Sequence, residues 1–240
     1  VGPTREVVSS IKQLQLRSAT VADAAKAQDL PEVSNQLSLL EKDLQTVGQK
    51  YSRLSWLKIV PFVNGFYRDG LHGLNAATHV LQAGKITVST IAPYADLVGF
   101  KGLATTGDGA KTAQDRINFI IETLDKAKPQ LGQIGSELAS ARTAVDQIKL
   151  TRYPTTFRGV SIRPRLASAI SLLDQGATLV TDAQPLLESA PYILGKDSPR
   201  KYLVLFQNDA ELRPTGGFMT AYSVIEVNKG KISIIQSNDI

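Results

Sequence analysis

A polar segment near the end of the chain, QNDAELRPTGG at residues 207–217, carries the side chains best suited to chemistry. It lies between two predicted strands, KYLVLF and FMTAYSVIEV. Arg213 offers a planar fork for a phosphate or carboxylate, and Asp209 or Glu211 could bind a divalent cation. The segment is therefore a candidate ligand loop, centred on Arg213, with these members: Asn208, Asp209, Glu211, Arg213, Thr215, Gly216 and Gly217.

The same loop has a purely structural interpretation. Glu211 and Arg213 could neutralise each other, and Gly216 and Gly217 could serve tight turns between the strands. Short polar loops are common and only a minority bind ligands, so composition alone favours this interpretation over the ligand site.

A second cationic segment, residues 152–165, holds four arginines and no acid, with Tyr153 and Phe157 between them. Such a patch could meet phosphates, an anionic lipid surface or a nucleic-acid strand. Arginine forks also pair well with carboxylates across helical bundles. We expect Arg158, Arg163 and Arg165 to contact acids of the protein more than lipid.

The composition narrows the function classes. With 42% hydrophobic and 20% charged residues the chain is globular, and its net charge of +5 does not imply a nucleic-acid partner. The absence of cysteine excludes disulfides, thiolate catalysis and cysteine metal sites. No phosphate-binding loop, dinucleotide fingerprint or Ser-His-Asp triad occurs, and His72 and His79 are too far apart along a helix to share a metal. No cofactor is evident from these motifs.

Most of the chain has the apolar spacing of long helices. From Val7 to Tyr51 apolar positions recur every three or four residues on both sides of the turn QDLPE, which predicts an antiparallel helical hairpin. Further helices are expected at 67–83, resuming to 98, at 117–148 with a kink or two abutting helices at Pro129, and at 166–187. A connector at 52–66 and a loop at 151–165 link them. No apolar run is long enough to span a membrane.

After Arg200 the pattern becomes that of strands, with a hairpin turn at NKGK. We predict an α+β chain: a long antiparallel helical bundle or coiled-coil body at 1–195, then the beginning of a truncated α/β domain at 196–240. Three strands, two of them a hairpin, bury little apolar surface, so we expect this domain to continue beyond Ile240.

The last forty residues resemble the bacterial family called domain of unknown function 4012. Its signature, N-x-x-E-x-R-x-T-G-G between strands, is matched by these residues: Asn208, Glu211, Arg213, Thr215, Gly216 and Gly217. The resemblance implies an extracytoplasmic protein of the cell envelope, anchored by an N-terminal transmembrane helix upstream of Val1. It implies no particular activity.

The order of strands and charged residues is also similar to the LytR-CpsA-Psr family, which transfers lipid-pyrophosphate-linked glycans using arginines and magnesium-binding aspartates. By that likeness Asp209 and Asp239 match the aspartates and Arg213 matches the loop arginine. Thr215 and Asn238 depart from it, standing where the family has an aspartate and an arginine. Magnesium is expected only under this alternative.

Two hypotheses follow. The leading one is a non-catalytic envelope module, in which the helical body is a stalk or partner-binding region and the terminal domain engages an anion, a glycan or a protein. The alternative is a phosphotransferase acting on lipid-pyrophosphate-linked glycan. Whether the chain is an enzyme is left open, and nucleic acid is not an expected partner.

Overall fold

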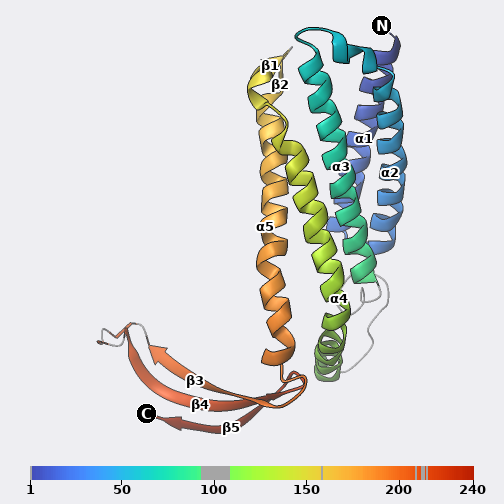
Figure 1. Cartoon of the computed structure of the whole chain (residues 1–240). Helices are drawn as coiled ribbons and strands as arrows, with labels where there is room; N and C mark the ends of the chain where they lie inside the picture. Colours follow the sequence, from blue (N-terminus) through green and yellow to red (C-terminus); the bar gives the residue numbers. More distant parts are fainter. Residues whose placement is uncertain (1, 93–108, 158, 209, 212–213, 215) are drawn as a thin grey trace. The chain divides into compact units, whose positions relative to one another are not determined.

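A computed structural model of the chain describes residues 2–92, 109–157, 159–208, 210–211, 214 and 216–240, with only the backbone described at 3 and 109–127 (Figure 1). The chain divides into two compact units: a helical unit, Val1–Ala104 with Pro129–Asp182, and a C-terminal unit, Thr105–Lys128 with Ala183–Ile240. The C-terminal unit thus includes segments that precede the strands. The predicted domain boundary at residues 195 and 196 stays a prediction.

The predicted helical hairpin is confirmed. Helix α1 (Gly2–Lys26) and helix α2 (Leu30–Ser52) pack against each other. The carboxylate of Asp29 caps α2 by accepting a hydrogen bond of 3.0 Å from the backbone N–H of Glu32, and Pro31 stands in the first turn, where its missing N–H costs nothing. The turn therefore stops one helix and starts the next.

Three longer helices follow: α3 (Asn64–Ile91), α4 (Gly109–Asp146) and α5 (Arg163–Ile193). Residues 93–98, where we expected α3 to resume, lie outside the described residues. Helix α4 runs continuously through Pro129, so it is not two abutting helices. Helix α5 continues past the predicted end at 187 and contains both Pro185 and Pro191.

A glycine, and not the prolines, ends α5. Gly195 adopts a φ of 65°, which a side chain disfavours, and the next residue, Lys196, donates its N–H to the carbonyl of Pro191 at 2.9 Å. This bond closes the last helical turn in the manner of a Schellman cap.

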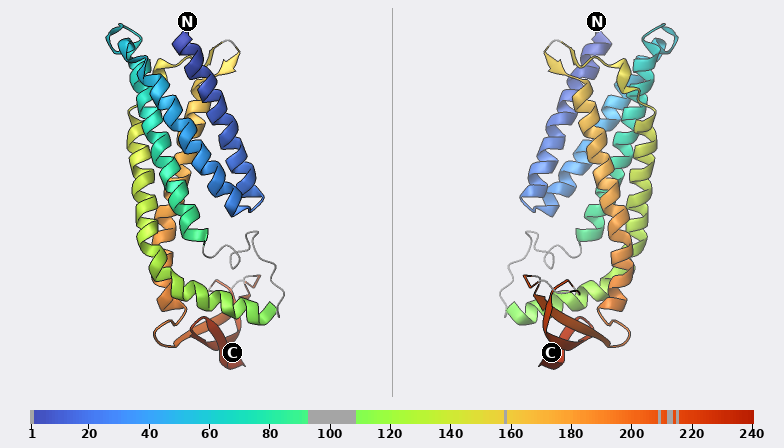
Figure 2. Two further views of the ribbon diagram at one scale, coloured as in Figure 1. Left: turned by 90° about the vertical axis from the view of Figure 1, so that its right-hand side faces the viewer. Right: turned by 90° about the vertical axis from the view of Figure 1, so that its left-hand side faces the viewer.

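The helical unit is held by an apolar seam and by ion pairs between helices, which lie side by side in Figure 2. Leu37, Leu44 and Leu81 are among the buried residues joining α1, α2 and α3. Each such leucine contributes about 1.5–3 kcal/mol of burial free energy. Small residues, Ala76 and Ala141, are buried where α3 meets α4. Interhelical pairs add to the seam: Arg17–Asp43 at 3.0 Å, Lys85–Glu41 at 2.9 Å, His79–Glu137 at 2.7 Å and Arg142–Asp174 at 2.5 Å.

Short elements close one end of the helical unit. A 3-10 helix, η1 (Ser55–Ile59), lies between α2 and α3, and a second, η3 (Leu150–Arg152), follows α4. Strands β1 (Thr156–Phe157) and β2 (Val160–Ser161) form a small antiparallel hairpin. The sequence predicted only a loop at 151–165. The hairpin has just two residue pairs, too few to leave a periodic pattern.

The C-terminal unit contains an antiparallel sheet in the order β3 (Arg200–Asn208), β4 (Phe218–Asn228), β5 (Lys231–Asp239). The hairpin at NKGK is confirmed: Lys229 and Gly230 have φ values of 47° and 74°, as a type I′ turn requires. With long helices and an antiparallel sheet, the chain has the predicted α+β class.

Candidate functional site

The sheet brings Asn208 and Asp239, from the two ends of the predicted site, to the same end of the strands. Asn208 pairs with Phe218 across β3 and β4, and two residues earlier Phe206 pairs with Ala221. Ala221 in turn pairs with Asp239 of β5. Asp239 and Asn208 therefore lie at the same end of the sheet, although 31 positions separate them in the sequence.

The described part of the loop is built for a turn. The side-chain oxygen of Asn208 accepts a hydrogen bond of 3.1 Å from the N–H of Ala210. Gly216 has a φ of 86°, and a Cβ on Gly217 would lie 2.6 Å from the carbonyl oxygen of Asn208. Both glycines are thus required by the chain's own backbone, as the structural interpretation predicts.

The structure does not test the ligand hypothesis for the remaining loop residues, so that hypothesis stays a prediction. Asp209, Arg213 and Thr215 lie outside the described residues, and Glu211 is exposed. Among the described residues no three His, Cys, Asp or Glu side chains gather as a metal site would need. A magnesium site using Asp209 and Asp239 stays a prediction of the alternative hypothesis.

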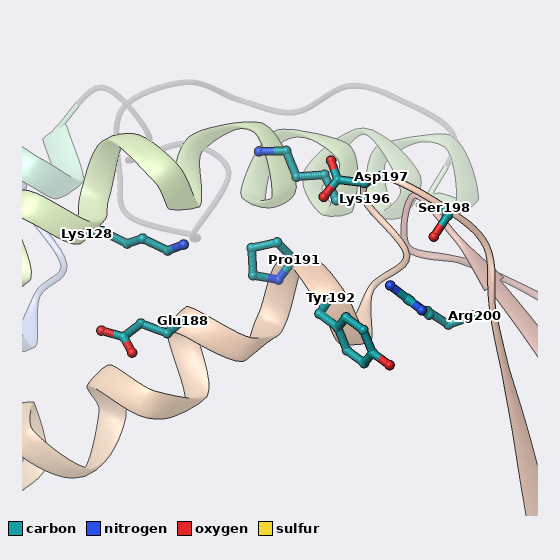
Figure 3. A pocket seen from close by; sticks show the side chains of 8 residues that line it. All are labelled: Lys128, Glu188, Pro191, Tyr192, Lys196, Asp197, Ser198 and Arg200. Atoms are coloured by element: carbon teal, nitrogen blue, oxygen red, sulfur yellow. The ribbon is translucent and has the colours of Figure 1, made fainter.

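A cleft that the sequence did not reveal lies in the C-terminal unit, where α5 ends and β3 begins (Figure 3). Its volume is about 260 Å³. It is lined by Lys128, Glu188, Pro191, Tyr192, Lys196, Asp197, Ser198 and Arg200. Three of these side chains are basic and two are acidic, so the lining carries a net positive charge.

Arg200 is the most distinctive group of this cleft. Its guanidinium carbon lies 3.7 Å from the centre of the Tyr192 ring, in stacking distance. Its Nε is buried and has no hydrogen-bond partner among the described residues. In Figure 3 Lys128 and Arg200 reach toward the cleft from opposite sides. A buried donor without an acceptor is costly. A guanidinium is a favoured partner of anionic oxygens, so the basic lining of this cleft suits an anionic ligand.

Backbone contacts fix the cleft walls. The N–H groups of Lys229 and Gly230, in the β4–β5 turn, donate to the carbonyls of Gly195 and Leu194 at 3.0 and 2.7 Å. The hydroxyl of Tyr202 donates to the carbonyl of Ile193 at 2.6 Å. The end of α5 is thereby pinned to the sheet, which holds Tyr192 beside Arg200.

Sequence reasoning overlooked this cleft for a physical reason. The predicted helix ends at residue 187 and the first predicted strand begins at Lys201, so the charged run GKDSPR at 195–200 falls between predicted elements. The available signal was the density of charge next to an aromatic residue. Its significance depends on the helix end folding back on the hairpin turn, which no local pattern predicts.

The arginine segment is divided between several roles in the helical unit. Arg152 forms a short ion pair with Asp69, whose side chain is only 3% exposed, and donates to the carbonyl of Gly65 at 2.9 Å. Arg163 donates to the backbone carbonyl of Tyr153 at 2.6 and 2.9 Å instead of to an acid. Arg165 is exposed, and Arg158 lies outside the described residues.

Aromatic rings surround the Asp69–Arg152 pair. Tyr51 stacks on Tyr67 with centroids 5.0 Å apart, and Phe66 meets Tyr153 edge to face at 5.3 Å. Burial, and then the negative charge of Asp69, raises the pKa of the Tyr153 hydroxyl to about 12. Burial also raises the pKa of Tyr51 to about 12. Both hydroxyls therefore stay protonated to a higher pH than those of exposed tyrosines.

Within the described ranges, no helix combines the length and apolar character needed to cross a membrane.

Comparison with known proteins gives one match. No curated protein and no solved structure matches the chain. Residues 197–239 match a family model described as protein of unknown function, DUF4012. This range contains β3, β4 and β5 and the glycine-bearing loop. The resemblance predicted from the loop signature is thus confirmed over the strand region of the chain.

Proposed function

We propose that this chain is a non-catalytic module of the bacterial cell envelope whose C-terminal unit binds an anionic glycan in the cleft at the end of α5. The helical unit serves as a stalk or partner-binding body. The ion pairs and buried apolar contacts between its helices are distributed along the helices, and contacts distributed in this way make a helical bundle stiff.

One observation carries the binding proposal: the stacked, partly buried Arg200. Its Nε lacks a hydrogen-bond partner among the described residues, and it stands in a lining with two lysines. Tyr192 is 62% exposed, so its ring remains available to a sugar face beside the cations. An aromatic ring next to positive charge matches a ligand with both apolar sugar faces and anionic groups.

The envelope location rests on the family resemblance. The match covers the strand region, and the likeness to extracytoplasmic proteins was drawn from the same loop. It supports an anionic wall or capsule glycan over other anions as the ligand class.

The proposal is tested by titrating the full chain with an oligomeric polyglycerol phosphate and with a neutral N-acetylglucosamine oligomer, using calorimetry. We expect binding of the anionic oligomer only. Arg200→Lys keeps the charge but loses the planar fork, and Lys196→Gln removes one charge. Each should weaken binding about tenfold or more, since charge-assisted hydrogen bonds contribute about 1.5–3 kcal/mol.

Lys26→Gln is the matched control, because Lys26 is an exposed lysine of the helical unit, remote from the cleft in sequence. Equal losses in Lys26→Gln and Lys196→Gln would mean that binding is only nonspecific charge attraction, against the proposal. The phosphotransferase alternative has its own signature: magnesium-dependent consumption of a polyprenyl-pyrophosphate glycan, abolished by Arg213→Ala and unaffected by Arg200→Lys.

A further inference from the structure

The connector between α2 and α3 exposes large apolar side chains at one end of the helical unit. Trp56 is 58% exposed, Ile59 is 85% exposed and Phe62 is 93% exposed. Single exposed apolar residues are ordinary on soluble proteins. Three within seven positions of one connector form a concentration of apolar surface of the kind that marks an interaction site.

The connector holds these side chains outward from a fixed base. Leu54 and Tyr67, at its two ends, are 6% and 3% exposed and pack in one buried cluster with Val7. Phe62 has a φ of 66°, a left-handed conformation that is unfavourable for a bulky residue. The fold therefore maintains a strained backbone at the residue whose ring is most exposed, a combination found at functional positions.

The same end of the helical unit is basic. Residues 53–68 contain three basic residues and no acid, and the described residues of 147–165 contain four basic residues and no acid. Arg152 links the two segments through its bond to the carbonyl of Gly65. Two acids of the described chain form ion pairs with these segments, Glu6 with Arg53 and Asp69 with Arg152.

The β1–β2 hairpin extends the apolar surface at this end. Phe157 is 59% exposed and Val160 is 41% exposed. In Figures 1 and 2 the hairpin and the connector project from the same end of the helical unit. Aromatic and aliphatic tips among basic side chains are typical of segments that lie at the interface between membrane and water.

We propose that this end of the helical unit, the connector 53–63 with strands β1 and β2, docks on an anionic lipid bilayer. Trp56, Ile59 and Phe62 enter the headgroup region, while exposed basic side chains nearby contact lipid phosphates, Lys58 and Arg165 among them. The net positive charge opposes pairing of two such ends, which favours lipid over a second copy of the chain. Each basic residue near an anionic surface strengthens attachment about fivefold.

Trp56 makes the test specific, because it is the only tryptophan in the chain. The full chain is mixed with vesicles of phosphatidylcholine alone and with vesicles containing 30% phosphatidylglycerol. We expect a blue shift of the tryptophan emission, and quenching by brominated acyl chains, with the anionic vesicles only. Unchanged emission with both vesicle types would overturn the proposal.

Two double variants distinguish lipid binding by the connector from nonspecific binding by exposed apolar side chains elsewhere. Ile59→Ser with Phe62→Ser retains the Trp56 reporter, and Leu16→Ser with Leu172→Ser removes two side chains that are 72% and 68% exposed on helices. Cosedimentation with anionic vesicles should fall at least tenfold for the connector pair and less than twofold for the helix pair. Equal losses would contradict a site at the connector.

Charge and self-association complete the test. Lys58→Glu with Arg165→Glu should weaken cosedimentation at least tenfold, whereas Lys26→Glu with Lys42→Glu should not. A blue shift that depends on protein concentration without lipid, together with dimers in sedimentation velocity, would assign the surface to a second copy and refute lipid docking. Unchanged helical circular dichroism of each variant confirms that folding is retained.

Discussion

Replacing Arg152 by alanine leaves the carboxylate of Asp69 buried without its partner. Asp69 is 3% exposed, whereas the Arg152 side chain is 26% exposed. Removing one member of a buried ion pair costs about 3–5 kcal/mol, and the partial exposure of Arg152 places this case at the lower end, roughly 3 kcal/mol. The variant also loses the hydrogen bond to Gly65 and the contact with the Phe66 ring, 5.9 Å from the guanidinium carbon.

Urea unfolding followed by circular dichroism measures this loss. With a slope of about 2 kcal/mol per molar urea, the midpoint of the helical transition should fall by about 1.5 M. Arg142→Ala is the control, because Arg142 bridges two half-exposed acids, Asp146 and Asp174, and should lose less than about 1 kcal/mol.

A double variant tests the cause. In Asp69→Asn with Arg152→Ala no unpaired charge is buried, so the double variant should be more stable than Arg152→Ala alone. A midpoint shift for Arg152→Ala no larger than that of Arg142→Ala would refute the reasoning that Asp69 and Arg152 form a buried, stabilising ion pair. Additive losses in the double variant would show that the charges are not coupled.

Two further predictions use the same physical arguments. The pKa values of Tyr51 and Tyr153 are raised to about 12 from an ordinary value of 10, so between these pH values the folded chain keeps protons that the unfolded chain releases. The contribution of these two groups to stability should be constant below about pH 10 and should be lost from pH 10 to about 12. Tyr51→Phe should make the fall in melting temperature over this range less steep, and an unchanged slope would contradict this prediction. Gly195→Ala should destabilise the C-terminal unit more than Gly159→Ala destabilises the helical unit. Both glycines have a positive φ, which costs alanine about 1–2 kcal/mol. An added Cβ at Gly195 would lie 2.2 Å from the carbonyl oxygen of Val227, whereas no described residue beyond the chain neighbours has an atom within 4 Å of an added Cβ at Gly159. Equal losses in thermal unfolding would mean that the contact with Val227 does not matter.

Local patterns in the sequence predicted the long helices, the three long strands and the turns that join neighbours, but not the short β1–β2 hairpin or the true end of α5. The heptad spacing before and after Asp29 predicted the α1–α2 hairpin, and Lys229 and Gly230 predicted the β4–β5 turn. These features depend on interactions between residues close in the chain, so a short segment of sequence is enough to predict them. The loop signature at 208–217 likewise predicted the family resemblance.

Packing between distant segments decided the rest. The sequence showed four arginines in one segment but not that Arg152 would pair with Asp69, 83 positions away, or that Arg163 would bind a backbone carbonyl. The sequence puts Arg200 directly before a predicted strand, but it does not show that Arg200 stacks on the ring of Tyr192 in the lining of a cleft. It also gave no sign that Phe62 would be held outward. Partner choice depends on which surfaces meet when helices and strands pack, and that information is not contained in the periodicity of any one segment.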